Sequence, residues 1–562
     1  MQPIHWQTAA LAVLVFAGWQ AESQAGVQIY SLGSPITGQP AQLLPPGAVA
    51  PSQVGQPIQR HSGPRPPAAL RSAEAAQLDS ADPVSALLAT GASLNLGLGF
   101  DAIDEATSGA GHPPPDPNVA ISSVIDTSTG AQYFVETVNR GLQAFDQNGM
   151  AVTGYTQFSS FFGSSGLLFD PRLVFDPYAK RFFAIALESD YTAHRGYIHV
   201  AVSATADPRG AWSVFRTDVP FSPTVYYPDY PSLGFDRQAI YVGVNLFRGS
   251  TDVPPGALLY RSIGKASMLS ATPQITTMVD VVQTTILPQY HWSMRAAQTL
   301  DLPIGAPAMG LFIGTFRDNS SQTTLFPKLH MVKVRKPLDA TQLSFTEFDA
   351  AVPGYREPFV DAPQWISCAA AADTIDVSSG QLQNAVWRQD DLYAAHTVHR
   401  QAGTTQLNAA RWYQIRTGPP DAPVAWSQLV QTGEIHGSSS DTTQHTYLPT
   451  VGVDAQRSLV VAYAQSSPAE PVSFWITARA ACAAEGQMQY QVLVASANHC
   501  YKEAVLGTPP YRWGDYWAVA IDPASPTLLW AVGEYVKSDD RYGTWIQAVD
   551  IIPECPICAC GR

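Results

Sequence analysis

Charged and aromatic side chains gather in short segments that precede apolar runs along most of the chain. Carboxylates, arginines and aromatic rings recur in these segments, although the segments lie tens of residues apart. Aromatic rings stack on sugar faces and arginine forks onto carboxylates, so this mixture suits a sugar or a carboxylated ligand. The candidate ligand-binding residues are Asp116, Asn118, Asp170, Arg172, Asp229, Tyr230, His291, Trp292, Arg295, His445, Arg512, Trp513 and Asp515.

Three of these candidates could also hold a metal ion. The side-chain oxygens of Asp116, Asn118 and Asp515 are of the kind that calcium prefers, so a calcium site is predicted there, and no other cofactor is required. The sequence contains no glycine-rich phosphate loop, no His-Glu-x-x-His and no Gly-x-Ser-x-Gly. Catalytic residues are therefore not assigned.

A repeated sequence motif is expected to bring the dispersed segments together. Each copy has a polar or proline-containing lead-in, a short apolar run that closes on Asp, a turn and an alternating strand. Two clear copies are Asp170-Pro-Arg-Leu-Val-Phe-Asp176 and Asp515-Tyr-Trp-Ala-Val-Ala-Ile-Asp522. A strand-rich repeat of this length is typical of a β-propeller. We therefore predict an all-β fold with seven four-stranded blades, or else six or eight, whose lead-ins meet at one mouth of a central channel.

The aspartate that closes each apolar run is expected to have a structural role. A carboxylate at this position can accept hydrogen bonds from backbone N–H groups of the following turn. The seven closing residues are Asp126, Asp176, Asp236, Asp301, Asp390, Asp454 and Asp522, and the copies at Asp301 and Asp390 are the least regular.

The composition divides the chain into four segments. An apolar block at 9–19 is too short for a membrane span, so 1–25 is predicted to be a signal peptide and the mature protein to lack a transmembrane span. Residues 26–110, rich in Pro, Gln and Ala, are predicted to form a disordered low-complexity leader or pro-segment. The propeller is expected at 111–552 and a cysteine-rich tail at 553–562.

Charge and cysteine content limit the partners and the compartment. The net charge of −14 and the absence of basic runs exclude nucleic acid as a partner. Six cysteines in an exported chain indicate disulfides, and Cys482 and Cys500 flank a predicted hairpin at 487–497, so these two are expected to pair. The partners of Cys368, Cys555, Cys558 and Cys560 are left open. We expect a secreted or cell-surface protein.

Several motifs, in their order, resemble a known family. They include Pro114-Pro-Asp-Pro-Asn118, Asp170-Pro-Arg-Leu-Val-Phe-Asp-Pro177, Tyr227-Pro-Asp-Tyr-Pro-Ser-Leu-Gly234 and Arg512-Trp-Gly-Asp-Tyr-Trp-Ala-Val-Ala-Ile-Asp-Pro523. Over about 110–550 the chain resembles secreted bacterial sialidase-like (BNR-type) propeller proteins, mostly of unassigned function. The resemblance implies the fold and export. A working sialidase would need three substrate-binding arginines and a Tyr–Glu pair, and the motifs assign no such pair.

Three functions follow from these patterns. The first is a secreted propeller that binds a glycan or an extracellular protein at the polar, aromatic mouth without catalysis. The second is an extracellular carbohydrate-active enzyme, a glycoside hydrolase or polysaccharide lyase, that uses two carboxyl groups at the mouth. The third is a structural cell-surface protein whose mouth is plugged.

Overall fold

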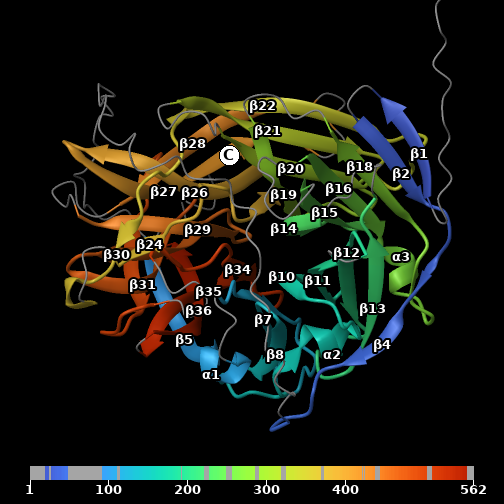
Figure 1. The fold of residues 1–562 in the computed structure, drawn as a ribbon, viewed down its shortest axis with the longest axis horizontal. Helices are drawn as coiled ribbons and strands as arrows, with labels where there is room; N and C mark the ends of the chain where they lie inside the picture. Colours follow the sequence, from blue (N-terminus) through green and yellow to red (C-terminus); the bar gives the residue numbers. More distant parts are fainter. Residues whose placement is uncertain are drawn as a thin grey trace, which may run out of the picture.

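In the computed structural model the chain is built almost entirely of β-strands (Figure 1). The described residues are 19–24, 27–48, 92–109, 114–190, 193–220, 227–247, 256–284, 290–317, 324–368, 373–419, 422, 425–436, 443–502, 509–538 and 540–553. Their strands form seven antiparallel groups, numbered along the chain. Within the described residues, no helix is long and apolar enough to cross a membrane.

In Figure 1 the first three groups are cyan to green, apart from the blue strands β1, β2 and β4 of the N-terminal segment. Group 1 consists of β6 (Asn118–Ile121), β7 (Tyr133–Val138), β8 (Gly141–Asp146) and β9 (Thr156–Gln157). Group 2 consists of β10 (Leu168–Asp176), β11 (Arg181–Asp190), β12 (Arg195–Ser203), β13 (Ala211–Asp218) and, at its edge, β4 (Gln39–Gln42). Group 3 consists of β14 (Tyr227–Phe235), β15 (Ala239–Phe247), β16 (Ala257–Gly264), β18 (Met278–Gln283), and then β2 (Val27–Leu32) and β1 (Trp19–Gln24).

The other four groups complete the molecule. Group 4 consists of β19 (Tyr290–Leu300), β20 (Met309–Arg317), β21 (Phe326–Arg335) and β22 (Ser344–Tyr355). Group 5 consists of β25 (Ala385–Arg388), β26 (Asp391–Ala402), β27 (Thr405–Arg416) and β28 (Gln428–Ile435). Group 6 consists of β29 (His445–Val453), β30 (Leu459–Ser467), β31 (Glu470–Arg479) and β32 (Tyr490–Ala495). Group 7 consists of β34 (Ala518–Ile521), β35 (Leu528–Ser538), β36 (Arg541–Pro553) and β5 (Ala92–Asp104).

Short elements connect the groups. β3 (Ile36–Thr37) pairs with β17 (Gln274–Ile275), and β23 (Ala362–Pro363), β24 (Thr374–Asp376) and β33 (Tyr511–Arg512) form a small sheet between distant parts of the chain. The described helices have five residues or fewer: α1 (Glu105–Ser108), α2 (Phe158–Phe162), α3 (Lys265–Met268) and the 3₁₀ helix η2 (Ile366–Cys368).

The innermost strands of the groups surround a common centre. In Figure 1 the groups follow one another around the molecule in chain order. β6 lies against β10, β10 against β14, and so on through β19, β25, β29 and β34, and β34 in turn lies against β6. Three groups are also joined into one fourteen-stranded sheet, because β19 pairs in parallel with both β14 and β25. The lead-in of each innermost strand therefore faces the same central region.

The aspartates that close the innermost strands have the predicted structural role in five groups. Oδ1 of Asp176 accepts hydrogen bonds from the backbone N–H groups of Tyr178 (2.8 Å) and Ala179 (3.2 Å). Asp126, Asp236, Asp454 and Asp522 accept equivalent bonds from the turns that follow them. The two least regular copies differ: Asp301 forms an ion pair with Arg388 (2.8 Å), and Asp390 has a positive φ of 70°.

The expected boundary between leader and folded body is wrong. β5 (Ala92–Asp104) pairs with β36 along its length and supplies the fourth strand of group 7. β2 and β4 extend groups 3 and 2 by pairing with β18 and β13. The polar and proline-rich composition of 27–48 concealed these strands, because β4 is the edge strand of its sheet and β2 is followed only by β1 at the edge of its own. Residues 49–91 lie outside the described part of the chain.

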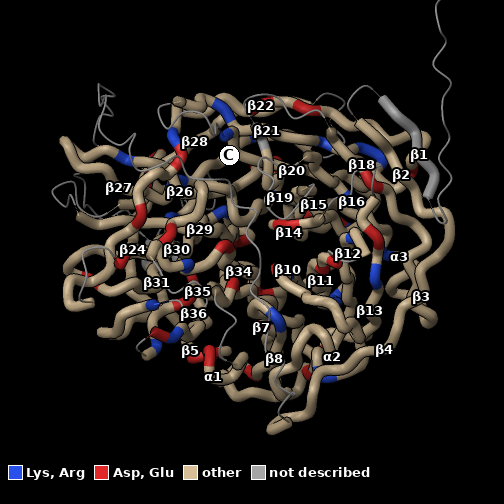
Figure 2. Tube along the Cα trace, in the orientation of Figure 1, with Lys and Arg blue, Asp and Glu red and all other residues tan. Residues whose placement is uncertain are grey.

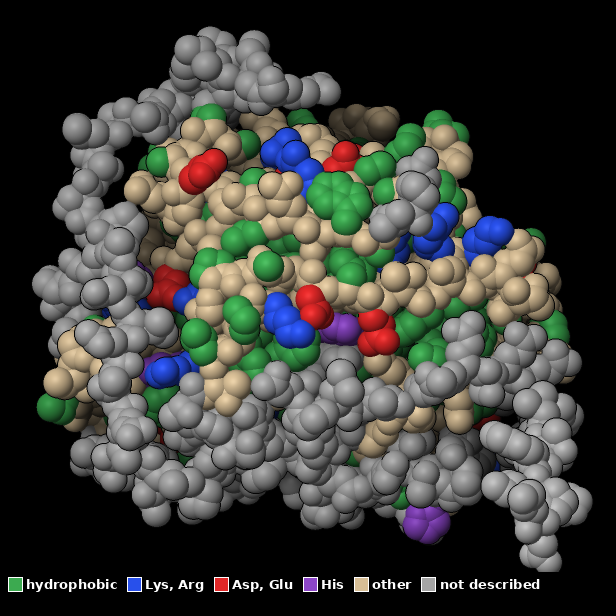
Figure 3. Space-filling model, turned by 90° about the horizontal axis from the view of Figure 1, so that it is seen from above, with side chains coloured by type: hydrophobic (Ala, Val, Ile, Leu, Met, Phe, Trp, Pro, Cys, Tyr) green, Lys and Arg blue, Asp and Glu red, His purple; other side chains and the backbone are tan. Residues whose placement is uncertain are grey.

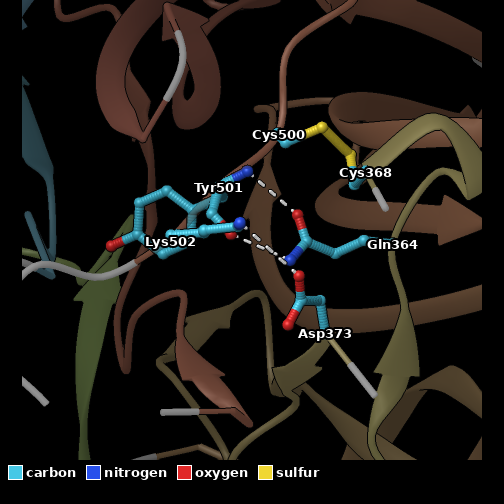
Figure 4. Close-up of a disulfide and its surroundings, with 6 residues drawn as sticks. All are labelled: Gln364, Cys368, Asp373, Cys500, Tyr501 and Lys502. Atoms are coloured by element: carbon cyan, nitrogen blue, oxygen red, sulfur yellow. Dashed lines mark hydrogen bonds and ion pairs between the residues drawn. A yellow bond between two sulfur atoms is a disulfide. The ribbon is translucent and has the colours of Figure 1, made fainter. Parts of the chain in front are cut away.

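The predicted Cys482–Cys500 disulfide is also wrong. The 487–497 segment contains a single strand, β32, so its two flanks lie at opposite ends of an extended segment rather than side by side. Cys500 pairs instead with Cys368 at the end of η2, and Gln364 exchanges two hydrogen bonds with the backbone of Tyr501 beside it (Figure 4). Cys482 is disulfide-bonded as well.

Charged residues line the outer edge of group 4. Nζ of Lys328 lies 2.7 Å from Asp349, and His330 lies 3.0 Å from Asp349 and 3.2 Å from Glu347. Figure 3 looks onto this side of the molecule and shows basic, acidic and histidine side chains next to one another. Such charges at the outermost strands of a sheet oppose edge-to-edge association.

A buried glutamate lies where group 1 meets group 7. The Glu136 side chain is 0% exposed, and its Oε2 accepts a hydrogen bond from the backbone N–H of Ile103 on β5 (2.8 Å). Burial in this apolar contact raises the pKa of Glu136 to about 8. In the folded protein the Glu136 carboxyl group therefore keeps its proton at pH values where the unfolded chain, with a pKa near 4.3, has released it. The free energy of unfolding consequently falls as the pH rises from about 4.3 towards 8.

Replacing Glu136 by Gln should remove this loss. We expect Glu136→Gln to increase the free energy of unfolding at pH 8 by about 1–3 kcal/mol, with little change near pH 4.5. Urea denaturation at the two pH values measures the difference. Glu188→Gln is the matched control. Burial opposes ionisation of Glu188, but the hydrogen bond with His199 and the charge of Arg216 lower the pKa of Glu188. This substitution should therefore destabilise the protein at pH 8. Equal effects of Glu136→Gln at both pH values would contradict the account.

Candidate functional site

Six groups share an uncommon backbone conformation, either within the first residues of the innermost strand or in the segment that precedes it. Asp116, Asp170, Tyr230, Ser293, Ser378 and Leu448 all have φ between 48° and 61°. Four of the six groups show a register shift at this point, for example between Phe169 and Arg172. Left-handed conformations cost energy for residues other than glycine and are found where the surroundings enforce them, often at functional sites. The repeat thus turns the chain at equivalent points around the centre.

Nine of the thirteen predicted ligand-binding residues meet at this centre. Asp116, Asn118, Asp170, Arg172, Asp229, Tyr230, Arg295, Arg512 and Asp515 interact electrostatically or by hydrogen bonds with one another. We call these nine residues, together with Tyr516, the mouth cluster. Figure 2 shows acidic positions around the centre of the molecule, beside β10, β14 and β34.

Two buried arginines form the base of the mouth cluster. Arg172 and Arg295 are 5% and 0% exposed, and both donate a hydrogen bond to the carbonyl oxygen of Pro231 (3.0 and 2.9 Å). Arg172 also donates to Gln383 O (2.8 Å), and Arg295 to Leu382 O (2.5 Å). Their guanidinium groups lie over the rings of Tyr516 and Tyr230, at 3.8 and 4.1 Å from the ring centres. Both arginines are thus held by backbone carbonyls and aromatic rings.

Asparagine and tyrosine connect the buried carboxyl groups. Nδ2 of Asn139 donates to Asp116 Oδ2 (2.6 Å), while Oδ1 of Asn139 accepts from the backbone N–H of Asp170 (2.9 Å). The Tyr516 hydroxyl donates to Asp170 Oδ2 (2.9 Å), and the backbone N–H of Asp515 donates to Asp116 Oδ1 (2.6 Å). Three lead-ins that are far apart in sequence are therefore linked by one hydrogen-bonded chain.

Close packing of acids shifts their proton affinity. Burial, with the nearby Asp515 charge, raises the pKa of Asp116 to about 7. Burial and the charges of Asp229 and Asp116 raise the pKa of Asp170 well above its usual range. Burial also raises the pKa of Glu534, whose Oε1 accepts from the Trp517 indole N–H at 3.1 Å. The raised pKa values of Asp116, Asp170 and Glu534 mean that these buried acids hold a proton to higher pH than exposed carboxyl groups do.

Three members of the mouth cluster remain partly exposed. Asp229, Arg512 and Asp515 lie at the rim, and Nη2 of Arg512 forms an ion pair with Asp515 Oδ2. Ser378 Oγ lies 3.4 Å from Asp515 Oδ1. The Asp515 carboxylate thus receives an arginine and a hydroxyl and still reaches solvent.

Four predicted residues lie elsewhere or lack a described side chain. Trp292 is 2% exposed and packs in a core with Phe247. Trp513 is 0% exposed and packs edge-on against Tyr501, with ring centres 4.9 Å apart. His445 is buried against Asn408 (3.1 Å), and burial lowers its pKa to about 4. His291 lies on β19, and its side chain is outside the described part.

Sequence reasoning missed four residues of the site. Asn139, Gln383, Tyr516 and Glu534 each contact the mouth cluster or its supports. Tyr516 is adjacent to the candidate Asp515, so its place in a lead-in was a usable signal. Asn139 and Glu534 lie on or directly after second strands, β7 and β35, which the repeat marks only as packing positions.

The predicted calcium ligands lie near one another. Asp116 and Asp515 are in contact through a backbone hydrogen bond, and Nδ2 of Asn118 lies 3.5 Å from Asp116 O. Both carboxylate oxygens of Asp116 already accept hydrogen bonds. Among the described residues no group of three or more His, Cys, Asp or Glu side chains is placed to hold a metal ion. Calcium binding at these three residues stays a prediction.

The space between the innermost strands, next to the mouth cluster, is nearly filled. A cavity of about 40 Å³ is lined by innermost strands and includes Asn118, Arg172, Gln383 and Trp517 on its wall. A buried water needs at least about 10–15 Å³ measured in this way, so the cavity has space for only a few waters. This cavity is too small for a sugar ring.

No protein family model and no curated protein matches this sequence. Several solved structures align with it. Trypanosoma rangeli sialidase, as a covalent intermediate, aligns with a TM-score of 0.31 at 10% identity over 72% of this chain, which spans 56% of the sialidase. A Hadza microbial sialidase aligns at 0.33 and 10% identity, covering 75% of this chain and 76% of its own. A polysaccharide lyase aligns at 0.36 and 9% identity, covering 81% and 99%.

These structures are what the chain resembles, in line with the sialidase-like resemblance predicted from its motifs. Their names give no activity to this protein, and its site is interpreted from its own residues.

Proposed function

We propose that this protein is a secreted seven-bladed β-propeller that binds a neutral glycan at its mouth without cleaving it. The seven strand groups would be the blades, and β5 would close the ring from the N-terminal side. Pairing of a distant strand with the last blade fits this architecture, because it leaves no open end between the first and last groups.

One observation carries the proposal: partly exposed carboxylates lie on a rigid, buried layer of arginine and tyrosine. Asp229 and Asp515 present acceptor oxygens at the rim, while Arg172 and Arg295 beneath them are engaged by backbone carbonyls and rings. Sugar hydroxyls are donors that carboxylates bind well, and a preorganised support limits the entropy lost on binding. Most donors of the buried arginines bind backbone carbonyls, although Nη2 of Arg295 has no hydrogen-bond partner among the described residues. The partly exposed groups at the rim include two carboxylates, which repel a carboxylated ligand, so we propose a neutral glycan.

A disulfide bond supports the proposal that the protein is exported. The Cys368–Cys500 disulfide joins residues 132 positions apart. Disulfides persist in oxidising compartments outside the cytosol. The apolar block at 9–19 supplies the expected export signal.

A second candidate is a carbohydrate-active enzyme. Its supporting observation is the Asp116 carboxyl group, whose pKa of about 7 suits a general acid and which touches the backbone of the ionisable Asp515. Asp116 is however 1% exposed, and both its oxygens are engaged. The binding function is therefore preferred.

The proposal predicts that rim carboxylates control affinity. On a glycan array, the protein should retain a subset of neutral glycans, and Asp515→Asn or Asp229→Asn should weaken that binding at least tenfold. Asp349→Asn is the matched control, because this exposed carboxylate pairs with Lys328 on the outer strands of group 4, outside the mouth cluster. Unchanged binding in both rim variants would refute a site at the mouth.

A further inference from the structure

A second pocket lies at the opposite ends of the innermost strands from the mouth cluster. It has a volume of about 640 Å³, within the range of small-molecule sites. Its wall is made by segments that follow β6, β10 and β34 and by the turn between β12 and β13: Ser123, Val124, Ile125, Pro177, Lys180, Arg181, Thr205, Ala206, Asp207, Pro523 and Ala524. We call it the basal pocket. The lead-ins lie before the same strands, so the two sites are at different ends.

The basal pocket carries two basic side chains that no carboxylate of the described residues neutralises. Lys180 is exposed, and its ammonium has no hydrogen bond or ion pair within the described part of the chain. Arg181 donates from Nη1 to the carbonyl oxygens of Lys180 (2.9 Å) and Ala179 (3.4 Å), so its charge is held in place without an acidic partner among the described residues.

The nearby acids are already compensated or hydrogen-bonded. Asp207 binds Arg209 through two bonds of 2.9 and 2.7 Å. Asp176 is 0% exposed and forms an ion pair with Lys265. Asp522 is 5% exposed and accepts hydrogen bonds from Ala524 N, Gln132 Nε2 and Trp530 Nε1. The pocket therefore carries local positive charge on a protein whose net charge is −14.

We propose that the basal pocket binds an oxyanion, a carboxylate or sulfate group of an acidic saccharide. Arginine and lysine side by side recognise such groups by charge-assisted hydrogen bonds. The pocket is wide enough for a sugar ring, and its prolines and aliphatic residues provide apolar contact. Lys180 is held in a left-handed turn with φ of 54°, which fixes where its side chain leaves the backbone.

Calorimetric titration of the full chain at low ionic strength tests this site. Sodium glucuronate and sodium sulfate are the probes, and they separate a uronate from a sulfate ligand. We expect saturable binding of at least one probe, weakened at least tenfold by Lys180→Gln. Lys336→Gln is the matched control, because Lys336 is also exposed at a left-handed turn (φ 48°) outside the pocket; it should leave binding unchanged.

Two results would overturn the proposal. One is the absence of saturable heat with either probe. The other is equal affinity in Lys180→Gln and the unsubstituted protein, which would place the anion elsewhere. Lys180 is exposed, so its replacement should leave the thermal midpoint unchanged. Asp515→Asn should not affect this titration, which keeps the basal pocket distinct from the mouth.

Discussion

Deletion of residues 92–104 should abolish cooperative unfolding of the protein. The deletion removes β5, whose backbone pairs with β36 from Ala92 to Asp104. It also removes Phe100 and Ile103, which pack in one core with Val119 and Phe134 of group 1 and with Ile546 of group 7. Without β5, β36 becomes an open edge and the contact between the first and last groups loses its apolar filling. Calorimetry of the purified variant should show no single sharp transition.

Single substitutions on β5 test the contribution of its buried side chains to stability. Ile103→Ala, at a side chain that is 0% exposed, should lower the free energy of unfolding by about 2–5 kcal/mol. Leu98→Ala is the control, because that side chain on the same strand is 47% exposed and should cost less than about 0.5 kcal/mol. A cooperative, native-like transition in the 92–104 deletion would show that β5 is dispensable for the fold.

Trp513→Ala should destabilise the protein by about 3–5 kcal/mol. The indole is 0% exposed and belongs to a core that includes Tyr501, Trp517 and Phe474. Its removal leaves a cavity beside Tyr501, in a core whose other rings include residues of β29, β31 and β35, and the packed strands cannot close over it. Urea denaturation monitored by circular dichroism gives the difference directly.

The control for Trp513 is a tryptophan at the surface. Trp426 is 39% exposed, so Trp426→Ala should cost much less than Trp513→Ala in the same assay. A Trp513→Ala protein with unchanged stability but weakened glycan binding would return this residue to the site and contradict its assignment to the core.

The sequence predicted the elements that follow from local patterns. The turn role of Asp176 is confirmed by its bonds to the following backbone. This role depends on a carboxylate next to its own turn, which is a short-range property. The gathering of the acidic lead-ins also follows, because a regular repeat places equivalent segments together.

Long-range features could not be predicted in this way. β5 lies more than 430 residues before its partner strand β36, and nothing in its Gly-rich and Leu-rich sequence indicates which strand it pairs with. The pairing of Cys500 with Cys368 depends on where η2 lies in space. Trp513 and Trp292 are of a residue type that is common in binding sites, but the packing of neighbouring strands places both side chains in cores.

The central claim is that the mouth cluster binds a neutral glycan and leaves it intact. Mass spectrometry of glycans recovered from the immobilised protein tests it most directly, with the Asp515→Asn variant run in parallel. The account predicts that the unsubstituted protein retains neutral glycans of unchanged mass and that Asp515→Asn retains far less. Shortened glycans with new reducing ends, or equal retention by both proteins, would contradict it.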